Sequence, residues 1–572
     1  MILKKRGDFL GKKIVLFFIF VAIVWGLTAG MKSVKIEEKD EVEVQSLMKD
    51  VNEIYRDELN ISISELDTFN PLKTKNADVV ALLNLIYEPL IAYKSDDELE
   101  YVLAESCTRL DEYNWIIKLK NNVKWHSGVT FTANDVVFTF NMLRNNDLTY
   151  SSNVKNINSI EVIGDDAIKI NLSLADDFFA SKLSFPIVPE YYFKGENFNN
   201  ENRISKMVGT GPYKYINTSD NIIELSFNKN WWKEDDAKLQ KIYVYKYATY
   251  GEAIKAFKSA DIDLIVTNMS SWKEKFGTIG VNSYSFENSE YELIVPNCNN
   301  VLLADNSVRR AILQAINREN IINSIYNDNA SVSDIPIHTN SKNSVTNAEY
   351  DIEKAKQILI NAGWSQSQDG WQKDIEGKKY SLHFTLMVNA DNKEKIAVAE
   401  KIKENLSEIG IPININKISI ENIKNNIKQD KFELALLSID IKNEMFTYSL
   451  VENESENNYA NYFSEAMNSI IENLKVDNLN YDENIYTYSL LFKNDAPYIG
   501  LYFKTSTILT NKSVKGNIEP TWSNYFRNIT TFCKWCETWN SLYIVLYIKS
   551  VDNKFWSFKI IFKINEKLFL TF

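Results

Sequence analysis

The side chains that could act as nucleophiles, bases or metal ligands are few and scattered in this sequence. They comprise four cysteines and three histidines: Cys107, Cys298, Cys533, Cys536, His126, His338 and His383. The last two cysteines form a CxxC pair, but a zinc site would need a second pair or nearby histidines, and a thioredoxin-like site would need a βαβ context. The patterns HExxH, GxSxG and GxxxxGK[ST] do not occur, so three common catalytic chemistries lack their motifs. We expect no enzyme, no bound metal ion and no cofactor.

The composition indicates a large folded protein with an acidic surface. The chain has 572 residues, and 64 Lys and Arg against 76 Asp and Glu give a net charge of −12, which disfavours nucleic-acid binding. The length is about four times that of a typical domain and predicts several lobes. Aromatic residues make up 13% of the chain, which suits an aromatic-lined cleft and equally a large core.

The N-terminus carries an export or anchor segment. A basic flank that includes Lys12 and Lys13 precedes 18 residues without a charge, 14–31, a length at the lower limit of a membrane-spanning helix. The basic flank is expected to stay cytoplasmic, so the rest of the chain lies outside. We favour an uncleaved anchor over cleavage near Ala29, and the run has no lipidation cysteine, because Met31 follows its small residues. Residues 32–55 are rich in charge and predict a solvated stalk.

The middle of the chain alternates the patterns of strands and helices, which predicts an α/β protein. Period-two alternation indicates strands, and apolar residues at helical spacing indicate helices, one of them opened by an N-cap Thr132. Gly363 and Gly410 are predicted to end two helices. The clearest strands are predicted over 114–120, 167–174 and 241–247, and the clearest helices over 132–143, 305–322, 351–362 and 395–409. We interpret Trp125 and Trp231 as core aromatics, and the Arg309–Arg310 pair as structural and on the polar side of its helix.

Six segments, in this order, resemble the bacterial extracellular solute-binding proteins of family 5, which include the oligopeptide- and dipeptide-binding proteins of ABC importers. The most specific is 103–143, where a strand, a turn "KWHSG" and a helix opened by "TAND" follow one another. The others are "LNLIYEPLI" at 83–91, "GTGPYKY" at 209–215, "FNKNWW" at 227–232, 295–322 and 350–364. In "AFKSADIDLI", Ser259 and Ala260 replace the usual Ala-Gly of the family. The resemblance covers roughly residues 56–527.

The resemblance implies a bilobal periplasmic-binding-protein-like α/β fold, of the class with an extra subdomain, whose two lobes close around a ligand cleft. The implied parts are an anchor 1–31, a stalk 32–55, a first lobe 56–298 with an inserted subdomain at about 96–205, a second lobe 299–510 and a return to the first lobe over 511–528. Residues 529–572 fall outside the resemblance. This tail is apolar and carries six Lys against three acids. It forms a hairpin or is translated from sequence beyond the usual stop, and we favour the second alternative.

The resemblance also implies which residues hold the ligand. Family members often bind the amino group of a peptide on a carboxylate just after a strand, and Asp440 in "LALLSIDIKNE" matches it, with Ser438 beside it. Leu437 stands where the family has a Trp, which puts the ligand class in doubt. Glu65 and Leu66 match a strand that offers its edge to the ligand, and Tyr150 matches a loop that covers it. Each of these residues also has an ordinary structural interpretation, as a turn, surface or packing side chain.

We therefore expect the substrate-binding component of an ABC importer, a monomer that captures peptides and delivers them to the permease subunits. It would be held on the outer face of the cytoplasmic membrane by its N-terminal helix. The alternative is a membrane-anchored receptor that senses peptides without bulk transport, which the missing lipidation cysteine slightly favours. A secreted hydrolase is disfavoured, since no nucleophile and base are arranged for it.

Overall fold

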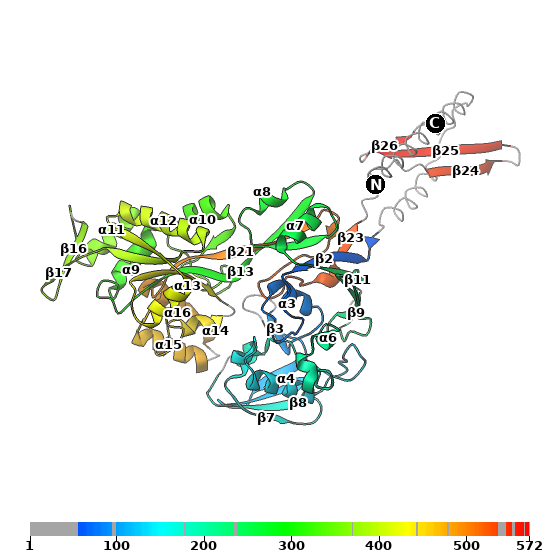
Figure 1. Cartoon of the computed structure of the whole chain (residues 1–572), viewed down its shortest axis with the longest axis horizontal. Helices are drawn as coiled ribbons and strands as arrows, with labels where there is room; N and C mark the ends of the chain where they lie inside the picture. The colour runs from blue at the N-terminus through cyan, green and yellow to red at the C-terminus, as the bar shows by residue number, and fades with distance from the viewer. Residues whose placement is uncertain are drawn as a thin grey trace. The chain divides into compact units, whose positions relative to one another are not determined.

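The computed structural model of the chain describes most of the region between residues 55 and 570 (Figure 1). The described ranges are 55–93, 99–176, 179–233, 237–368, 370–441, 444–476, 480–535, 545–551, 555–564 and 567–570. The predicted anchor 1–31 and nearly all of the predicted stalk lie outside them. Within these ranges no helix combines the length and the apolar character that a membrane crossing requires. The chain divides into a large unit, Asp57–Cys533, and a small unit formed by its two terminal segments.

The small unit contains paired strands from both ends of the chain. Strand β1 (Tyr55–Arg56) pairs antiparallel with β23 (Cys533–Trp535). Three tail strands, β24 (Val545–Val551), β25 (Phe555–Ile564) and β26 (Lys567–Leu570), form an antiparallel sheet in that order. The apolar runs of the tail therefore lie in strands.

The large unit is built on a mixed sheet that has eleven strands within the described residues. Its order is β19-β18-β20-β13-β21-β12-β2-β11-β10-β9, and β14 pairs with β21 beside this path. The strands are β2 (Glu58–Ser64), β9 (Tyr213–Ser219), β10 (Ile222–Phe227), β11 (Lys241–Tyr247), β12 (Leu264–Thr267), β13 (Val281–Pro296), β14 (Ala330–Val332), β18 (Phe384–Asn389), β19 (Ile413–Ile418), β20 (Leu434–Asp440) and β21 (Ile499–Asn511). The alternating sequence of β2 explains its central place, because Leu59, Ile61 and Ile63 are all buried on one face.

Two long strands, β13 and β21, run antiparallel through two separate hydrophobic cores. Phe286 on β13 and Ile508 on β21 belong to the first core, whereas Tyr291 and Phe503 belong to a core on the other side. The pairing of the two strands shifts register between Glu287 and Tyr291, a bulge of the kind that bends a strand. We call the parts on either side the first and the second lobe. The change of core precedes the predicted boundary at 298.

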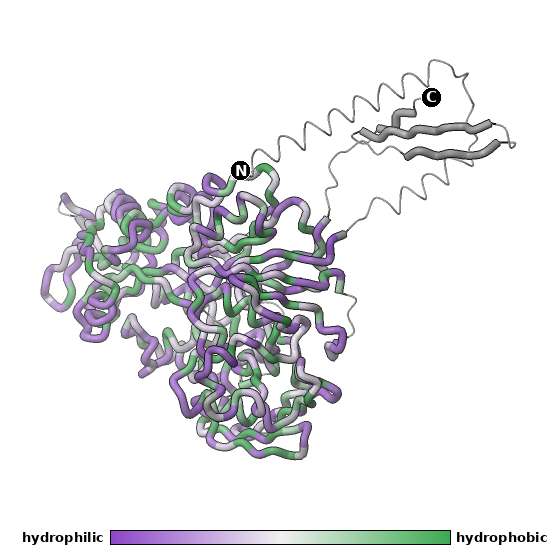
Figure 2. The backbone as a smooth tube through the Cα atoms, turned by 45° about the vertical axis from the view of Figure 1, so that its right-hand side comes forward, coloured by the Kyte–Doolittle hydropathy of each residue, from purple (hydrophilic) through white to green (hydrophobic). Residues whose placement is uncertain are grey.

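The first lobe includes a four-stranded antiparallel sheet, β5-β6-β8-β7, within the predicted subdomain. Its strands are β5 (Ala104–Arg109), β6 (Asn114–Leu119), β7 (Ile157–Val162) and β8 (Ala167–Leu172), and helix α4 (Ala133–Asn145) follows Thr132 as its N-cap. The Asp135 carboxylate accepts hydrogen bonds from the backbone N–H of Thr132 at 3.0 Å and of Glu190 at 2.9 Å. The "TAND" pattern therefore opens the helix by capping it. In Figure 2, hydrophobic stretches follow the inner strands, and many of the outer turns are hydrophilic.

The second lobe places helices around parallel strands β18, β19 and β20. The helix predicted over 305–322 is wrong in one respect, because it divides into α9 (Asn306–Ala315) and α10 (Arg318–Tyr326). Ile316 is extended, and the Asn317 side chain caps the second helix. Arg309 is 3% exposed and donates to backbone carbonyls that include Ala496 O and Asp495 O, so it does not lie on a polar surface.

The remaining elements complete both lobes. The helices are α3 (Ala77–Leu83), α5 (Glu190–Phe193), α6 (Glu201–Ile204), α7 (Tyr250–Lys258), α8 (Trp272–Phe276), α11 (Ile352–Asn361), α12 (Lys393–Glu408), α13 (Ile420–Lys428), α14 (Glu444–Ser449), α15 (Glu465–Val476) and α16 (Tyr481–Asp495). The short strands are β3 (Ile91–Tyr93), β4 (Leu99–Tyr101), β15 (Ser365–Ser367), β16 (Gly370–Ile375), β17 (Lys378–Ser381) and β22 (Val514–Lys515). Helices α11 and α12 confirm the predictions from periodicity, and Gly363 and Gly410 after them have φ of +84° and +80°.

Three of the family-like segments meet at one buried carboxylate, Glu88. It accepts hydrogen bonds from Trp231 Nε1 at 3.1 Å, Trp232 Nε1 at 2.8 Å and Thr210 Oγ1 at 2.9 Å. Burial raises the pKa of Glu88, and these donors oppose that effect. His126 joins the same region, because its backbone N–H donates to Gly209 O at 2.8 Å and its Nε2 lies 2.9 Å from Gly211 O. These segments therefore hold the first lobe together.

Candidate functional site

The lobes are joined where β13 and β21 cross between the two cores, which is where the resemblance implies a ligand cleft. The polar residues on the second-lobe side of this crossing form ion pairs. Lys504 Nζ lies 2.7 Å from Glu290 Oε1, and Lys395 pairs with Glu292, which is fully buried. Burial by itself would raise the pKa of Glu290, but the attraction and hydrogen bond of Lys504, together with Ser438 and the charge of Lys395, lower it. The charges of these four residues are thus paired within the protein, and we call Glu290, Glu292, Lys395 and Lys504 the ion-pair frame.

Asp440 is the last residue of β20, and it lies opposite Glu290 in the antiparallel pairing with β13. It is exposed, as a ligand contact at a strand end would be. Its charge reaches Tyr525 in the segment that returns to the first lobe. The pKa of Tyr525 is raised to about 12, chiefly by burial and further by the charges of Asp78 and Asp440. Residues of both lobes therefore act on one phenol.

Ser438 lies on the same face of β20 as Asp440, two residues earlier. Its hydroxyl donates to Glu292 Oε2 at 2.8 Å and accepts from Lys395 Nζ at 2.7 Å. These bonds use its hydroxyl proton and one of its lone pairs within the ion-pair frame, so its role here is to hold Lys395 and Glu292 in place. Leu437, which replaces a Trp of the family, is buried in the second-lobe core.

Glu65 and Leu66 follow directly on β2, which pairs with β11 on one side and β12 on the other and is therefore not an edge strand. Glu65 has φ of +52°, and its backbone carbonyl accepts a hydrogen bond from Asn76 Nδ2 at 2.9 Å. The same Asn76 caps α3 through its side-chain oxygen, so one amide fixes both the turn and the helix start. The Glu65 side chain is exposed, and Leu66 is 39% exposed, which leaves both side chains accessible at the end of the strand.

Tyr150 lies in the first lobe, at the start of a short 3-10 turn, Ser151–Val154. Its ring centre is 6.2 Å from that of Phe185, and the side chain packs against the first core. Burial raises the pKa of its hydroxyl. Tyr150 therefore takes part in the packing of the subdomain, where it contacts Phe185.

Two residues near these strand ends, Asp78 and Tyr525, were not predicted from the sequence. Asp78 lies in the first turn of α3, and Ser64 Oγ donates to its carboxylate at 3.3 Å. Burial raises the pKa of Asp78 to about 6, and the charge of Glu65 adds to the shift. Asp78 and Tyr525 line a cavity of about 10 Å³ beside β2 and β12, which is room for one water molecule. An acidic residue in a helix first turn next to a strand end was a signal for Asp78, but Tyr525 had none.

In the described ranges, no three Asp, Glu, His or Cys side chains lie close enough together to hold a metal ion. The site chemistry visible at the crossing is instead that of carboxylates, a phenol and exposed strand ends. Such groups bind by charge and by backbone hydrogen bonds.

Comparison with known proteins gives a consistent family. The family model for the middle part of bacterial extracellular solute-binding proteins, family 5, matches residues 98–459. The oligopeptide-binding protein AppA of Bacillus subtilis is 26% identical over 499 residues, which cover 81% of this chain and 90% of AppA. The nickel-binding periplasmic protein of Escherichia coli is 25% identical over 354 residues, or 58% of this chain and 66% of that protein.

A solved structure agrees with this fold. The structure of AppA from Bacillus subtilis in complex with a nonapeptide has a TM-score of 0.58 and 23% sequence identity, and it covers 83% of this chain and 98% of that one. The chain therefore belongs to the bacterial extracellular solute-binding proteins of family 5, the non-enzymatic substrate-binding components of ABC importers, which act outside the cytoplasm.

Proposed function

We propose that this protein captures peptides in the cleft between its lobes and delivers them to the permease subunits of an ABC importer. The observation that carries the proposal is Asp440, an exposed carboxylate at the end of β20 whose charge acts on Tyr525 together with that of Asp78. An unblocked peptide offers an ammonium group to such a carboxylate. The oligopeptide-binding relative, covered over 90% of its length, supports this ligand class.

The ligand is held at more points than its amino group. The residues at the end of β2, Glu65 and Leu66, have accessible side chains, which can contact a peptide that lies across the end of this strand. Hinge movement at the crossing of β13 and β21 closes the lobes around the peptide, and the ligand shifts the population towards the closed form that the permease recognises. Residues 14–31 hold the protein at the membrane in this proposal.

The test is calorimetry of Asp440→Asn with trialanine and pentaalanine, each with a free and with an acetylated amino terminus. A charge-assisted contact in a closed cleft contributes about 2–4 kcal/mol when one partner is removed, so we expect roughly thirtyfold to several hundredfold weaker binding. Acetylation should weaken wild-type binding similarly and add little in the variant. Asp147→Asn, at an exposed site in the first lobe, is the matched control.

Two results would contradict the proposal. Equal affinities of both proteins for free and acetylated peptides would remove Asp440 from the site. Absence of binding by either peptide, together with a non-peptide molecule found by mass spectrometry in the purified protein, would replace the ligand class.

A further inference from the structure

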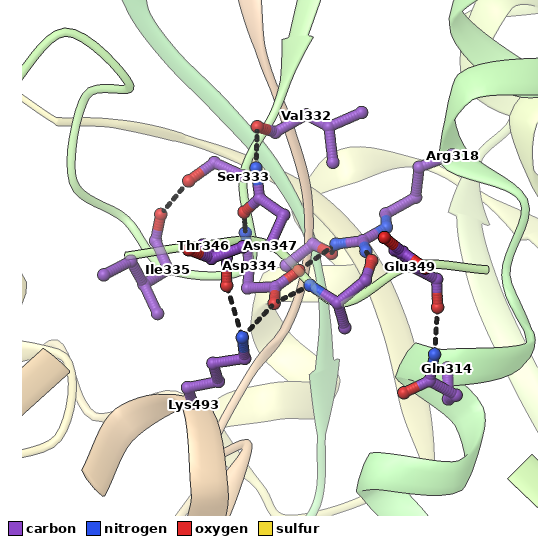
Figure 3. Close-up of polar contacts among 12 residues, drawn as sticks. Gln314, Arg318, Val332, Ser333, Asp334, Ile335, Thr346, Asn347, Glu349 and Lys493 are labelled. Carbon is purple, nitrogen blue, oxygen red and sulfur yellow. Dashed lines mark hydrogen bonds and ion pairs between the residues drawn. The ribbon is translucent and has the colours of Figure 1, made fainter. Parts of the chain in front are cut away.

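One histidine lies at the junction of the two lobes and takes no part in the proposed ligand contacts. His338 is 6% exposed and belongs to the loop between β14 and α11. Asp334 holds the start of this loop on the second lobe, because its carboxylate pairs with Arg318 and accepts from the backbone N–H of Ala348 (Figure 3). Lys493 on α16 lies 3.9 Å from the same carboxylate. The loop therefore moves with the second lobe.

The imidazole of His338 stacks with two aromatic rings. Its centre lies 4.4 Å from that of Phe503, with 24° between the planes, and 6.1 Å from that of Trp522, with 6° between the planes. Phe503 belongs to the second-lobe core. Trp522 belongs to the segment that returns to the first lobe, where its ring centre lies 5.6 Å from that of Tyr93 on β3. The contact between His338 and Trp522 thus joins one lobe to the other.

A single carboxylate faces the imidazole among the contacts of the described residues. His338 Nδ1 lies 3.4 Å from Glu287 Oε2, on β13 at the crossing, and the Thr339 backbone N–H donates to the same oxygen at 3.0 Å. Burial alone would raise the pKa of Glu287, but the donors His338 and Thr339 outweigh it, and the pKa is lowered. Phe503 and Trp522 present only ring faces, and His338 Nε2 is buried without a partner within the described ranges.

Protonation of His338 changes the strength of both contacts. An imidazolium attracts the Glu287 carboxylate as an ion pair, and as a cation against two aromatic rings it also gains cation–π attraction. Protonation places a hydrogen on Nε2, which is buried without a partner among the described residues, so these two gains must exceed that cost to hold the ring against Trp522. We propose that the stack of Phe503, His338 and Trp522 is a latch between the lobes that tightens in acid and loosens when His338 is neutral. The latch would restrain the hinge whatever ligand the cleft takes.

The small number of histidines makes this testable. Burial lowers the pKa of His126 to about 4, so it stays neutral above pH 5, and His383 is exposed and serves as the control. Asp78 titrates in the same window near Tyr525, three residues from Trp522, and therefore needs its own control. The fluorescence emission of Trp522 is obtained by subtracting the emission of the Trp522→Phe variant from that of the wild type. It is measured from pH 8 to pH 5.

Because the imidazole beside the indole becomes charged and is drawn towards it in acid, we expect the Trp522 emission to fall between pH 8 and pH 5. The fall should persist in His383→Gln and Asp78→Asn and vanish in His338→Gln. His338→Phe, which keeps a stacked ring without a charge, repeats the test if the Gln variant does not fold. Amide exchange in 333–349 and in 520–526, corrected for the intrinsic effect of pH, should slow by about threefold to tenfold in acid in the wild type only.

Three results would overturn the latch. The first is a Trp522 emission that does not change with pH in the wild type. The second is a change that survives in His338→Gln or His338→Phe, and the third is a change lost in Asp78→Asn, which would assign the titration to that carboxylate. Since no peptide is present in these measurements, their failure would leave the assignment of Asp440 untouched.

Discussion

At the scale of single residues, polar side chains that are close neighbours in the sequence have different surroundings in the structure. Asp440 and Ser438 were predicted together, but Ser438 is bound by Lys395 and Glu292, whereas Asp440 is exposed at the strand end. No local pattern reports such a difference, because the partners of Ser438 come from a distant helix and a distant strand. The partners of Ser438 could therefore not be predicted from the sequence, whereas the position of Asp440 at the end of a strand could, and its role as a ligand contact stays a prediction.

Asp78 gives a prediction on the dependence of stability on pH. Its pKa is about 6 in the folded protein against 3.8 for an unperturbed aspartate, so the folded state binds the proton more tightly and loses stability as the pH rises from about 4 through 6. A shift of about two pKa units corresponds to about 3 kcal/mol. Asp78→Asn should therefore be more stable than the wild type by about 1–3 kcal/mol at pH 7.5 and about equally stable at pH 4. Urea unfolding at both pH values measures this, and an equal difference at both would refute it.

At the scale of elements, local patterns predicted most strands and helices, and they failed where a local break was stabilised by capping. The helix over 305–322 divides at Ile316 because Asn317 caps α10, although the apolar spacing continues through the break. The family-like segments have a physical reason as well: Glu88, Thr210 and the Trp231–Trp232 pair come from three segments and form one buried network. Their spacing in the sequence indicated turns and strands but not this meeting point.

Two glycines should respond oppositely to the same substitution. A Cβ at Gly209 would lie 1.8 Å from Ile86 O, whereas a Cβ at Gly251, in α7, would meet only Thr249 Oγ1 at 3.9 Å. Gly209→Ala must displace backbone and should cost more than about 3 kcal/mol. Gly251→Ala should stabilise the protein by about 0.5–1 kcal/mol, because alanine favours the helix. Thermal unfolding of both variants would contradict this account if their midpoints moved in the same direction.

At the scale of the whole molecule, the α/β class and the family could be predicted from the sequence, but the point where one lobe becomes the other could not. The boundary expected at 298 rests on the order of segments, whereas the cores change between Phe286 and Tyr291. The tail boundary expected at 529 also crosses a packed region, because Ile529 and Phe532 are buried in the first core. The limits of the lobes depend on pairing between strands that are hundreds of residues apart, and a local sequence pattern does not report such pairing.

The position of the protein in the cell is open to a direct test. We predict that residues 14–31 keep the chain in the membrane fraction with an intact N-terminus. Val21→Arg places a charge in the middle of this run and should release the protein or block its export, since such a charge costs about 2.5–3.5 kcal/mol at the centre of a membrane helix. Lys12→Arg is the control. Cell fractionation with mass spectrometry of the N-terminal peptide decides, and mature protein that begins near Met31 in the medium would refute the anchor.

The continuity of β21 into the first core has a consequence for the order of folding. The first lobe receives its last strand pairing from residues 507–510 and its last core side chains from Phe526, Ile529 and Phe532. When the chain emerges with its N-terminus first, the first lobe therefore cannot be completed until nearly all residues up to 532 are available, because contacts of such large sequence separation form late. The second lobe is contained within one continuous stretch and can fold before the first. This delay suits a polypeptide that must stay unfolded while it crosses a membrane.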